Sequence, residues 1–127
     1  MAKITLQELE ALLNAGERQF KGCDLSGLDL NGLNLSAVTL SRADLSLTKL
    51  NEANLENANL FSANLNGANL NKAILREANL SQTRMALACL READLTEANL
   101  FLADLTGTDF TRACFKGIIL SRADLTG

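Results

Sequence analysis

A large apolar residue recurs at every fifth position from Phe20 to Leu125, without a break. An α-helix cannot use this period, because five residues turn a helix by about 500° and leave successive apolar residues about 140° apart. A straight strand cannot use it either, since an odd step places successive side chains on opposite faces. The chain must therefore bend once in each unit, so that every central residue points toward one axis. The period predicts a solenoid.

The positions before each central residue support this interpretation. The residue two places earlier is usually alanine, as in Ala53, Ala58 and Ala63. Residues two apart share a face of an extended segment, so these alanines should also point inward, where small residues alternating with large ones fill a narrow tube. The residue between them is usually Asp or Asn, whose short side chains can bond nearby backbone at a bend.

The resulting unit, Ala-(Asp/Asn)-Leu-X-X, is clearest in ANLENANLFSANLNGANL at 53–70. It resembles the pentapeptide-repeat family, and the resemblance covers residues 18–127. The resemblance implies an all-β solenoid, namely a right-handed quadrilateral β-helix in which four units make one coil of 20 residues. About five and a half such coils, spaced by roughly 4.8 Å, would give a rod about 25 Å long.

Coils of this size would stack residues 20 apart. The stacked column Glu52, Lys72, Glu92 and Arg112 would alternate in charge, each neighbouring pair contributing about 0.2 to 1 kcal/mol. Asn59, Asn79 and Asn99 would also stack, so that their amides could bond to one another along the column.

Residues 5–15 are the one segment with a helical period. Thr5 can act as N-cap with Glu8 as its capping-box partner, Ile4 and Leu9 can form a hydrophobic staple, and Gly16 suits the position after the C-cap. The apolar face of this helix would consist of Leu6, Leu9, Leu12 and Leu13. We expect residues 1–17 to form a helix that caps the open N-terminal end of a single domain, whose residues 18–127 form the solenoid.

Composition limits the partners. The chain has 127 residues, a net charge of −3 at pH 7, and no histidine, proline, tryptophan or tyrosine. Nothing in this charge favours a polyanion, so no nucleic-acid partner is expected. No apolar stretch reaches about 18 residues and the start MAKITLQELE lacks the layout of a signal peptide, so no membrane partner is expected and a cytoplasmic location is the default.

Catalysis is not expected. Without histidine, neither a Ser-His-Asp nor a Cys-His arrangement can form. Two carboxylate pairs, Asp24 with Asp44 and Asp104 with Asp124, should stack and could hold a hard cation, although all four residues occupy the repeat's own Asp/Asn position. An uninterrupted rod also has no loops to form a cleft. We therefore expect no enzyme, no cofactor and no metal.

The cysteine pattern indicates free thiols. Cys23 should point inward, whereas Cys89 and Cys114 occupy outward Asp/Asn positions. Their number is odd and no CxxC spacing occurs, so free thiols are the simplest interpretation. A redox role for the two outward cysteines stays open.

Apolar residues at outward positions are the candidates for a functional surface. They are Phe61, Phe101, Leu102 and Ile119 on one face, and Leu47 and Leu87 on the adjoining face. Such a cluster often marks a partner site, although scattered surface apolar residues are also ordinary.

A second group of bulky residues lies near the C-terminal end: Phe110, Phe115, Ile118, Ile119 and Leu120. It suits an end-to-end homodimer, as the family resemblance implies, and it equally suits a tapered tip.

Two classes of function follow. The one we favour is a non-catalytic structural or protein-interaction module built on a rigid rod. The alternative comes from the family's fluoroquinolone-resistance branch: a DNA mimic that modulates a type II topoisomerase, gyrase. A mimic needs an acidic surface, yet the net charge is only −3 and the acidic columns are interrupted by basic residues, namely Arg76, Arg84, Arg91 and Arg112.

Overall fold

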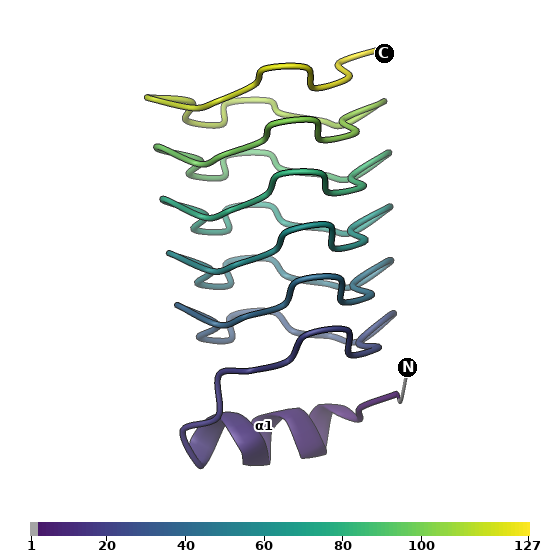
Figure 1. The fold of residues 1–127 in the computed structure, drawn as a ribbon, viewed down its shortest axis with the longest axis vertical. Helices are drawn as coiled ribbons and strands as arrows, with labels where there is room; N and C mark the ends of the chain where they lie inside the picture. Colours follow the sequence, from purple (N-terminus) through teal and green to yellow (C-terminus); the bar gives the residue numbers. More distant parts are fainter. Residues whose placement is uncertain (1–2) are drawn as a thin grey trace.

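The computed structural model describes residues 3–127, which form a rod of stacked coils above one α-helix (Figure 1). Each coil pairs with the next through single parallel β-bridges between residues 20 apart, from Gln19–Thr39 to Asp104–Asp124. Successive bridges along the chain lie five residues apart, for example at Asn54, Asn59, Asn64 and Asn69. The predicted solenoid and its 20-residue coil are therefore confirmed, and each strand is reduced to a single bridge within residues 3–127.

Backbone hydrogen bonds run along the rod in both directions. Leu65 N–H donates to the carbonyl of Arg84 in the next coil (2.6 Å), and Asn64 N–H donates to Ala43 in the previous one (2.9 Å). In the unit 63–67 every N–H has an acceptor, which in order are Leu60 O, Ala43 O, Arg84 O, Asn64 Oδ1 and Ala86 O. The backbone N–H groups of this unit therefore all donate to neighbouring coils or to turns.

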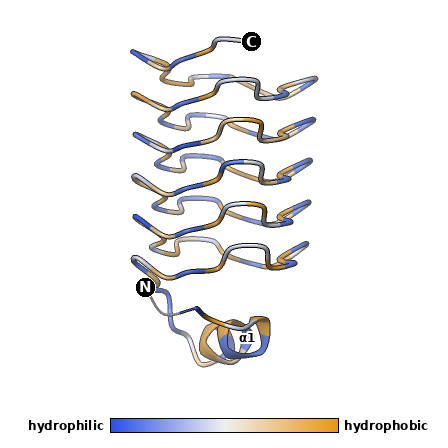
Figure 2. Ribbon diagram, turned by 90° about the vertical axis from the view of Figure 1, so that its right-hand side faces the viewer, coloured by the Kyte–Doolittle hydropathy of each residue, from blue (hydrophilic) through white to orange (hydrophobic). Residues whose placement is uncertain are grey.

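The core is a single column of apolar side chains along the rod axis. All central residues from Phe20 to Leu105 are at most 2% exposed, and so are the inward alanines from Ala43 to Ala103. In the first coil the bulkier Cys23, Leu28 and Leu33 are half-buried at the alanine position. Hydrophobic and hydrophilic residues alternate along every coil (Figure 2), which is the pattern expected when inward and outward positions alternate.

Helix α1 (Leu6–Asn14) lies across the N-terminal end of the rod (Figure 1). Thr5 Oγ1 accepts from Glu8 N–H at 3.1 Å, and the Glu8 carboxylate accepts from Thr5 N–H at 3.3 Å, so the capping box is confirmed. Gly16 has φ of 90° and donates to Leu13 O, while Glu17 N–H donates to Leu12 O. These two bonds form a Schellman motif, as expected of glycine after a C-cap.

The cap differs from its predicted form in two respects. Leu9 is fully buried and Leu6 and Leu13 are half-buried, but Leu12 is exposed, because it lies at the edge of the apolar face rather than on it. The segment before α1 also joins the solenoid: Lys3 bridges Asp24, and Ile4 N–H donates to Asp24 O at 3.0 Å. The first coil is therefore covered by a short strand as well as by the helix.

The Asp and Asn side chains bond the turn that follows them. Asn59 Oδ1 accepts from Phe61 N–H at 3.1 Å, and Asn99 Oδ1 accepts from Phe101 N–H at 3.0 Å. Ser81 N–H bonds Asn79 in the same way. The predicted amide-to-amide ladder along Asn59, Asn79 and Asn99 is therefore wrong, because the nearest unsatisfied donor is the turn N–H two residues later.

In three units of residues 3–127 whose Asp/Asn position holds another residue, an asparagine of the previous coil supplies the acceptor instead. Arg84 cannot accept, and Ala86 N–H instead donates to Asn66 Oδ1 at 2.9 Å. Cys89 occupies this position in the next unit, and there Arg91 N–H donates to Asn71 Oδ1 at 2.9 Å. These bonds tie neighbouring coils together through side chains.

The predicted charge ladder forms only in part. Among residues 3–127, its one ion pair is Arg112 with Glu92, at 3.7 Å and well exposed to solvent, so its contribution is small. Arg76 forms an ion-pair network that the sequence did not predict, with its guanidinium 3.1 Å from Asp94 and 4.0 Å from Glu56.

Candidate partner surface

The corner turns of the rod decide which side chains face outward. At one corner Leu60 O accepts from Ala63 N–H at 2.9 Å, and Ser62 has φ of 56°. A positive φ at the third residue of such a turn is typical of type II turns. The two residues after each central residue therefore project from a corner, and the second adopts a left-handed conformation that costs a non-glycine residue about 1–2 kcal/mol.

Phe61 and Phe101 occupy one corner, and we name this the Phe corner. They lie two coils apart, and both rings are half-buried. The same position holds Ser41 in the coil before Phe61 and Ser81 in the coil between the two phenylalanines, each only 7% exposed. The Arg42 guanidinium lies over the Phe61 ring, 5.7 Å from its centroid. This cation–π contact explains part of the burial of Phe61.

Leu47 and Leu87 occupy the next corner, which we name the Leu corner. Their side chains are 70% and 76% exposed, and both residues have positive φ, of 58° and 60°. Each lies against a glycine of the following coil, Leu47 against Gly67 and Leu87 against Gly107. The prediction that these leucines point outward is confirmed; their role remains a prediction.

The two remaining candidates lie beside Phe101. Leu102 follows it at the Phe corner and is 42% exposed, whereas Ile119 pairs with Asn99 on the flat face before that corner and is 47% exposed. Sequence reasoning missed Ile74, an exposed isoleucine on another face. An apolar residue at the Asp/Asn position was the signal that would have identified it.

A charged row lies between the Phe corner and the Leu corner. The bridges join its members in the order Asp24, Asp44, Asn64, Arg84, Asp104 and Asp124. Lys3 lies 3.8 Å from Asp24, whereas no ion pair within residues 3–127 involves Asp44, Asp104 or Asp124. Hydrogen bonds from the Thr126 hydroxyl and N–H lower the pKa of Asp124, which keeps its carboxylate charged.

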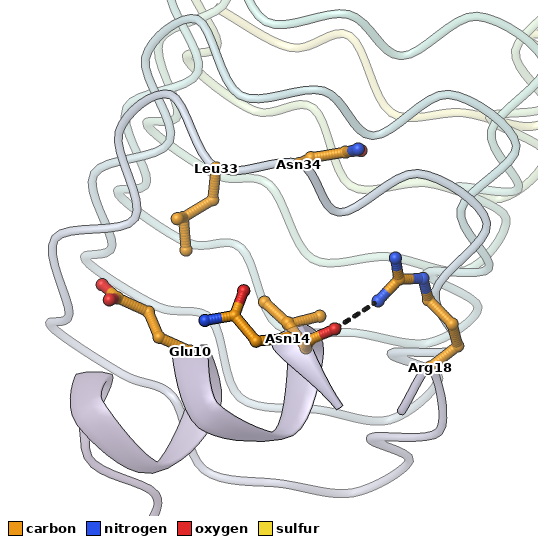
Figure 3. A pocket seen from close by; sticks show the side chains of 6 residues that line it. Glu10, Asn14, Arg18, Leu33 and Asn34 are labelled. Carbon is orange, nitrogen blue, oxygen red and sulfur yellow. Dashed lines mark hydrogen bonds between the residues drawn. The ribbon is translucent and has the colours of Figure 1, made fainter. Parts of the chain in front are cut away.

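A cavity of about 310 Å³ lies between α1 and the first coil, contrary to the expectation of no cleft (Figure 3). It is lined by Glu10, Leu13, Asn14, Arg18, Leu33 and Asn34. The Arg18 guanidinium donates to the carbonyls of Leu13 (3.5 Å) and Glu17 (3.0 Å), and so holds the C-terminal end of the helix. The cavity lies where the helix covers the first coil incompletely, and the Arg18 guanidinium that lines it already serves the cap.

The apolar residues at the predicted dimer end are more exposed than those of the middle coils. Phe110 and Phe115 contact each other edge to face, with ring centroids 5.4 Å apart and planes at 66°. Phe115 is exposed, and Ile118 and Leu120 are half-buried, unlike the fully buried central residues of the middle coils. Aromatic pairs of this geometry stabilise a surface cluster modestly.

The carboxylate pairs stack as predicted but bond their own turns. Asp24 Oδ1 accepts from Ser26, and Asp44 Oδ1 accepts from Ser46, through both N–H and hydroxyl. Within residues 3–127, no three Asp, Glu, Cys or His side chains come together in a way that could hold a metal ion. The described part of the chain also has no helix with the length and apolar character needed to cross a membrane.

The three cysteines are free thiols in different surroundings. Burial raises the pKa of Cys23. The Cys89 thiol donates to Asn71 Oδ1 at 2.8 Å. Cys114 is exposed, and its pKa is lowered by the hydroxyl of Thr96, 3.5 Å away, by the N–H of Lys116 and by the charge of Arg76. Cys114 is therefore the most reactive of the three by environment.

Comparisons with known proteins agree with this architecture. The family model described as "Pentapeptide repeats (8 copies)" matches residues 19–57, 53–90 and 88–127. Rfr23, a pentapeptide repeat protein from the cyanobacterium Cyanothece 51142, is 30% identical, with a TM-score of 0.58 over 93% of this chain and 97% of its own. A search of curated proteins gave no match.

Two further solved structures are less similar in shape. A pentapeptide repeat protein of the Arabidopsis thaliana thylakoid lumen is 34% identical, with a TM-score of 0.44 over 71% of this chain and 66% of its own. QnrB1, a plasmid-mediated fluoroquinolone resistance protein, is 20% identical, with a TM-score of 0.46 over 85% of this chain and 62% of its own.

Proposed function

The chain belongs to the pentapeptide repeat family, and we propose that it is a non-catalytic module that binds a protein partner through the side of its rod. The rod in this proposal is a right-handed quadrilateral β-helix. A rigid scaffold with a fixed 20-residue coil holds its outward side chains at set positions without ordering any loop. Binding by such a surface avoids the entropy cost of ordering flexible segments.

One observation supports this proposal above the others. Leu47 and Leu87 are 70% and 76% exposed and have positive φ. A leucine there adds backbone strain without gaining burial, whereas glycine fills the same position at Gly67 and Gly107. Apolar side chains with this much exposed surface suit a contact with another molecule.

The test is a comparison of partner capture by surface variants. Affinity-tagged protein is incubated with extract of its native cells, and retained proteins are identified by mass spectrometry. A partner should be retained by the wild type and lost with Phe61→Ser/Phe101→Ser. The matched control is Glu52→Ser/Glu92→Ser, two residues also 40 apart at another corner, which should retain it.

The partner so identified is then purified and titrated against each variant. Equal affinity for wild type and the phenylalanine variant, with unchanged thermal unfolding of both, would contradict the proposal.

The DNA-mimic alternative predicts inhibition of gyrase supercoiling instead. We do not favour it, because Arg84 interrupts the one row that carries Asp44 and Asp104.

We also propose that the end coil contacts a second copy through Phe110, Phe115, Ile118 and Leu120. Sedimentation should then show a species of twice the 13.6 kDa chain mass, which Phe115→Glu removes. A monomer at every concentration would contradict this contact.

We also propose a cytoplasmic location, because three free thiols suit a reducing compartment. Cell fractionation tests this location.

A further inference from the structure

One side of the rod combines two apolar borders with a charged floor. The Phe corner contributes Phe61, Phe101 and Leu102, and the Leu corner contributes Leu47 and Leu87. The floor is the row from Asp44 to Asp124, because residues 44, 64, 84, 104 and 124 each lie between the two corners along the chain. We name this side the bordered face. It repeats its apolar positions every two coils.

The bordered face cannot bind a peptide by adding a strand. Units 43–47 and 103–107 resemble unit 63–67 in that each backbone N–H already has an acceptor in a neighbouring coil or in its own turn. A partner therefore receives no main-chain donors from these units. It must be recognised by side-chain contacts alone, which favours a ligand that needs no backbone pairing.

The spacing of the apolar positions favours one backbone conformation. Two coils advance the rod by roughly 9.6 Å, twice the usual strand spacing. A polyproline II helix advances about 9.3 Å in one turn of three residues. Side chains on one face of a strand recur at about 6.7 Å. On one face of an α-helix they recur at about 5.4 Å after one turn and about 10.5 Å after seven residues. Residues three apart in a polyproline II segment thus match Leu47 and Leu87 best.

The charge of the floor defines the rest of the ligand. Asp44, Asp104 and Asp124 form no ion pair within residues 3–127. Each uses Oδ1 to accept from the serine or threonine two residues later. The second carboxylate oxygen of Asp104 is therefore available to a cation, and the Asp124 carboxylate, which also accepts from the Thr106 side chain, follows it in the row. Arg84, which lies between Asn64 and Asp104 in the row, disfavours a cation at the middle of the face.

We propose that the bordered face binds a proline-rich segment in the polyproline II conformation, lying parallel to the rod axis, with a basic residue beyond its prolines. Prolines three residues apart contact Leu47 and Leu87, and the Phe corner forms the opposite wall. The Arg or Lys that follows pairs with Asp104 and Asp124. This inference rests on the proposed function as a partner-binding rod and specifies its partner's chemistry.

The test uses a fluorescent peptide with proline at every third position and arginine at one end. Its binding to the purified protein is followed by fluorescence anisotropy. We expect saturable binding, weakened at least about tenfold by Leu47→Ser/Leu87→Ser. Asp104→Asn should weaken it about threefold and reduce its dependence on salt, because an exposed ion pair is screened.

Two controls isolate the recognition. Glu52→Ser/Glu92→Ser changes two residues with the same positive φ and the same spacing at another corner, and should leave the affinity unchanged. A peptide of the same composition with its prolines rearranged should bind at least about tenfold more weakly. Thermal unfolding of every variant verifies that the rod is intact.

Several results would overturn the inference: no saturation up to millimolar peptide, equal binding of the rearranged peptide, or tighter binding of an amphipathic helical peptide. The proposed function is judged separately by the capture experiment. A captured partner that depends on the Phe corner, together with failure of the proline-rich peptide, removes this inference alone. Failure of both experiments removes the proposed function as well.

Discussion

The side chain of Leu47 covers Gly67 in the next coil so closely that a Cβ atom on Gly67 would lie 2.8 Å from Leu47 Cδ2. Leu87 and Gly107 repeat the contact, at 2.9 Å. Glycine suits position 67 in two ways: its φ of 66° lies in the left-handed region, and a Cβ there would have to displace the end of the Leu47 side chain. Leucine and glycine thus alternate along the Leu corner as complementary surfaces.

This contact predicts different costs for two glycine substitutions. Gly27→Ala should cost about 1 kcal/mol, the strain of a left-handed alanine, because nothing lies within 4 Å of its added Cβ. Gly67→Ala should cost more, since Leu47 must also move. Urea unfolding measures both free energies. In a Leu47→Ala background the two costs should become equal; an undiminished difference would show that Leu47 is not responsible.

Substitutions in the buried core should cost much more stability than substitutions at an exposed corner. Leu65 is fully buried on the rod axis, so Leu65→Ala should lower the free energy of unfolding by about 2–5 kcal/mol. Leu65→Arg should prevent folding, because an unpaired charge would lie in the core. Gln82→Arg, at an exposed corner, should be nearly neutral. Similar melting temperatures for Leu65→Ala and Gln82→Arg would contradict this account.

The coil-to-coil asparagines predict an effect that the repeat pattern alone does not. Asn71 Oδ1 accepts from Arg91 N–H and from the Cys89 thiol. Asn71→Ala should therefore cost about 0.5–1.5 kcal/mol, the net value of a hydrogen bond, since water can reach the exposed Arg91 N–H that loses its acceptor. Arg91→Ala, which removes only an exposed ion pair at 3.9 Å, is the control and should change stability little. Equal losses in urea unfolding would contradict the assignment.

The five-residue period and the capping signals at Thr5 and Gly16 were sufficient to predict the coil and the cap, because each depends on residues close in sequence. The role of Asn71 was not predictable in this way, since it depends on Cys89 occupying an Asp/Asn position in the next coil. The cavity beside Arg18 depends on how the helix lies on the coil, which no local pattern encodes.

The sequence predicted which side chains of the candidate surface point outward, but not how much of each is exposed. Register alone placed Leu47 and Leu87 outward, and both are exposed. The same reasoning placed Phe61 outward, but its ring is half-buried beneath Arg42, a residue of the previous coil. Contacts between coils decide how much of an outward side chain remains available, and those contacts join residues about 20 apart.

Acid should destabilise the rod below about pH 4. Hydrogen bonds from Ser26, Thr111 and Thr126 lower the pKa of Asp24, Asp109 and Asp124 respectively. A carboxylate with a lowered pKa in the folded state contributes stability above its unfolded value of about 3.9, and that contribution is lost as pH falls through the folded value.

The triple variant Asp24→Asn/Asp109→Asn/Asp124→Asn tests this origin. Asparagine keeps the acceptor oxygen but does not titrate, as Asn99 shows in the same position of its own unit. At pH 7 the variant should melt slightly below the wild type, because neutral asparagine lacks the contribution of the charged carboxylates, and it should lose less stability than the wild type between pH 5 and pH 3. Parallel pH profiles would assign the acid sensitivity to other groups.

Thiol reactivity should follow the surroundings of the cysteines. Alkylation by iodoacetamide near neutral pH should reach Cys114 first, because it is exposed and the Thr96 hydroxyl lowers its pKa, and Cys23 last, because burial raises its pKa. Mass spectrometry of digested samples gives each rate. Thr96→Val should slow Cys114, whereas Thr111→Val, at the same position of another unit, should not. A Cys114 rate unchanged by Thr96→Val would show that exposure alone controls this thiol.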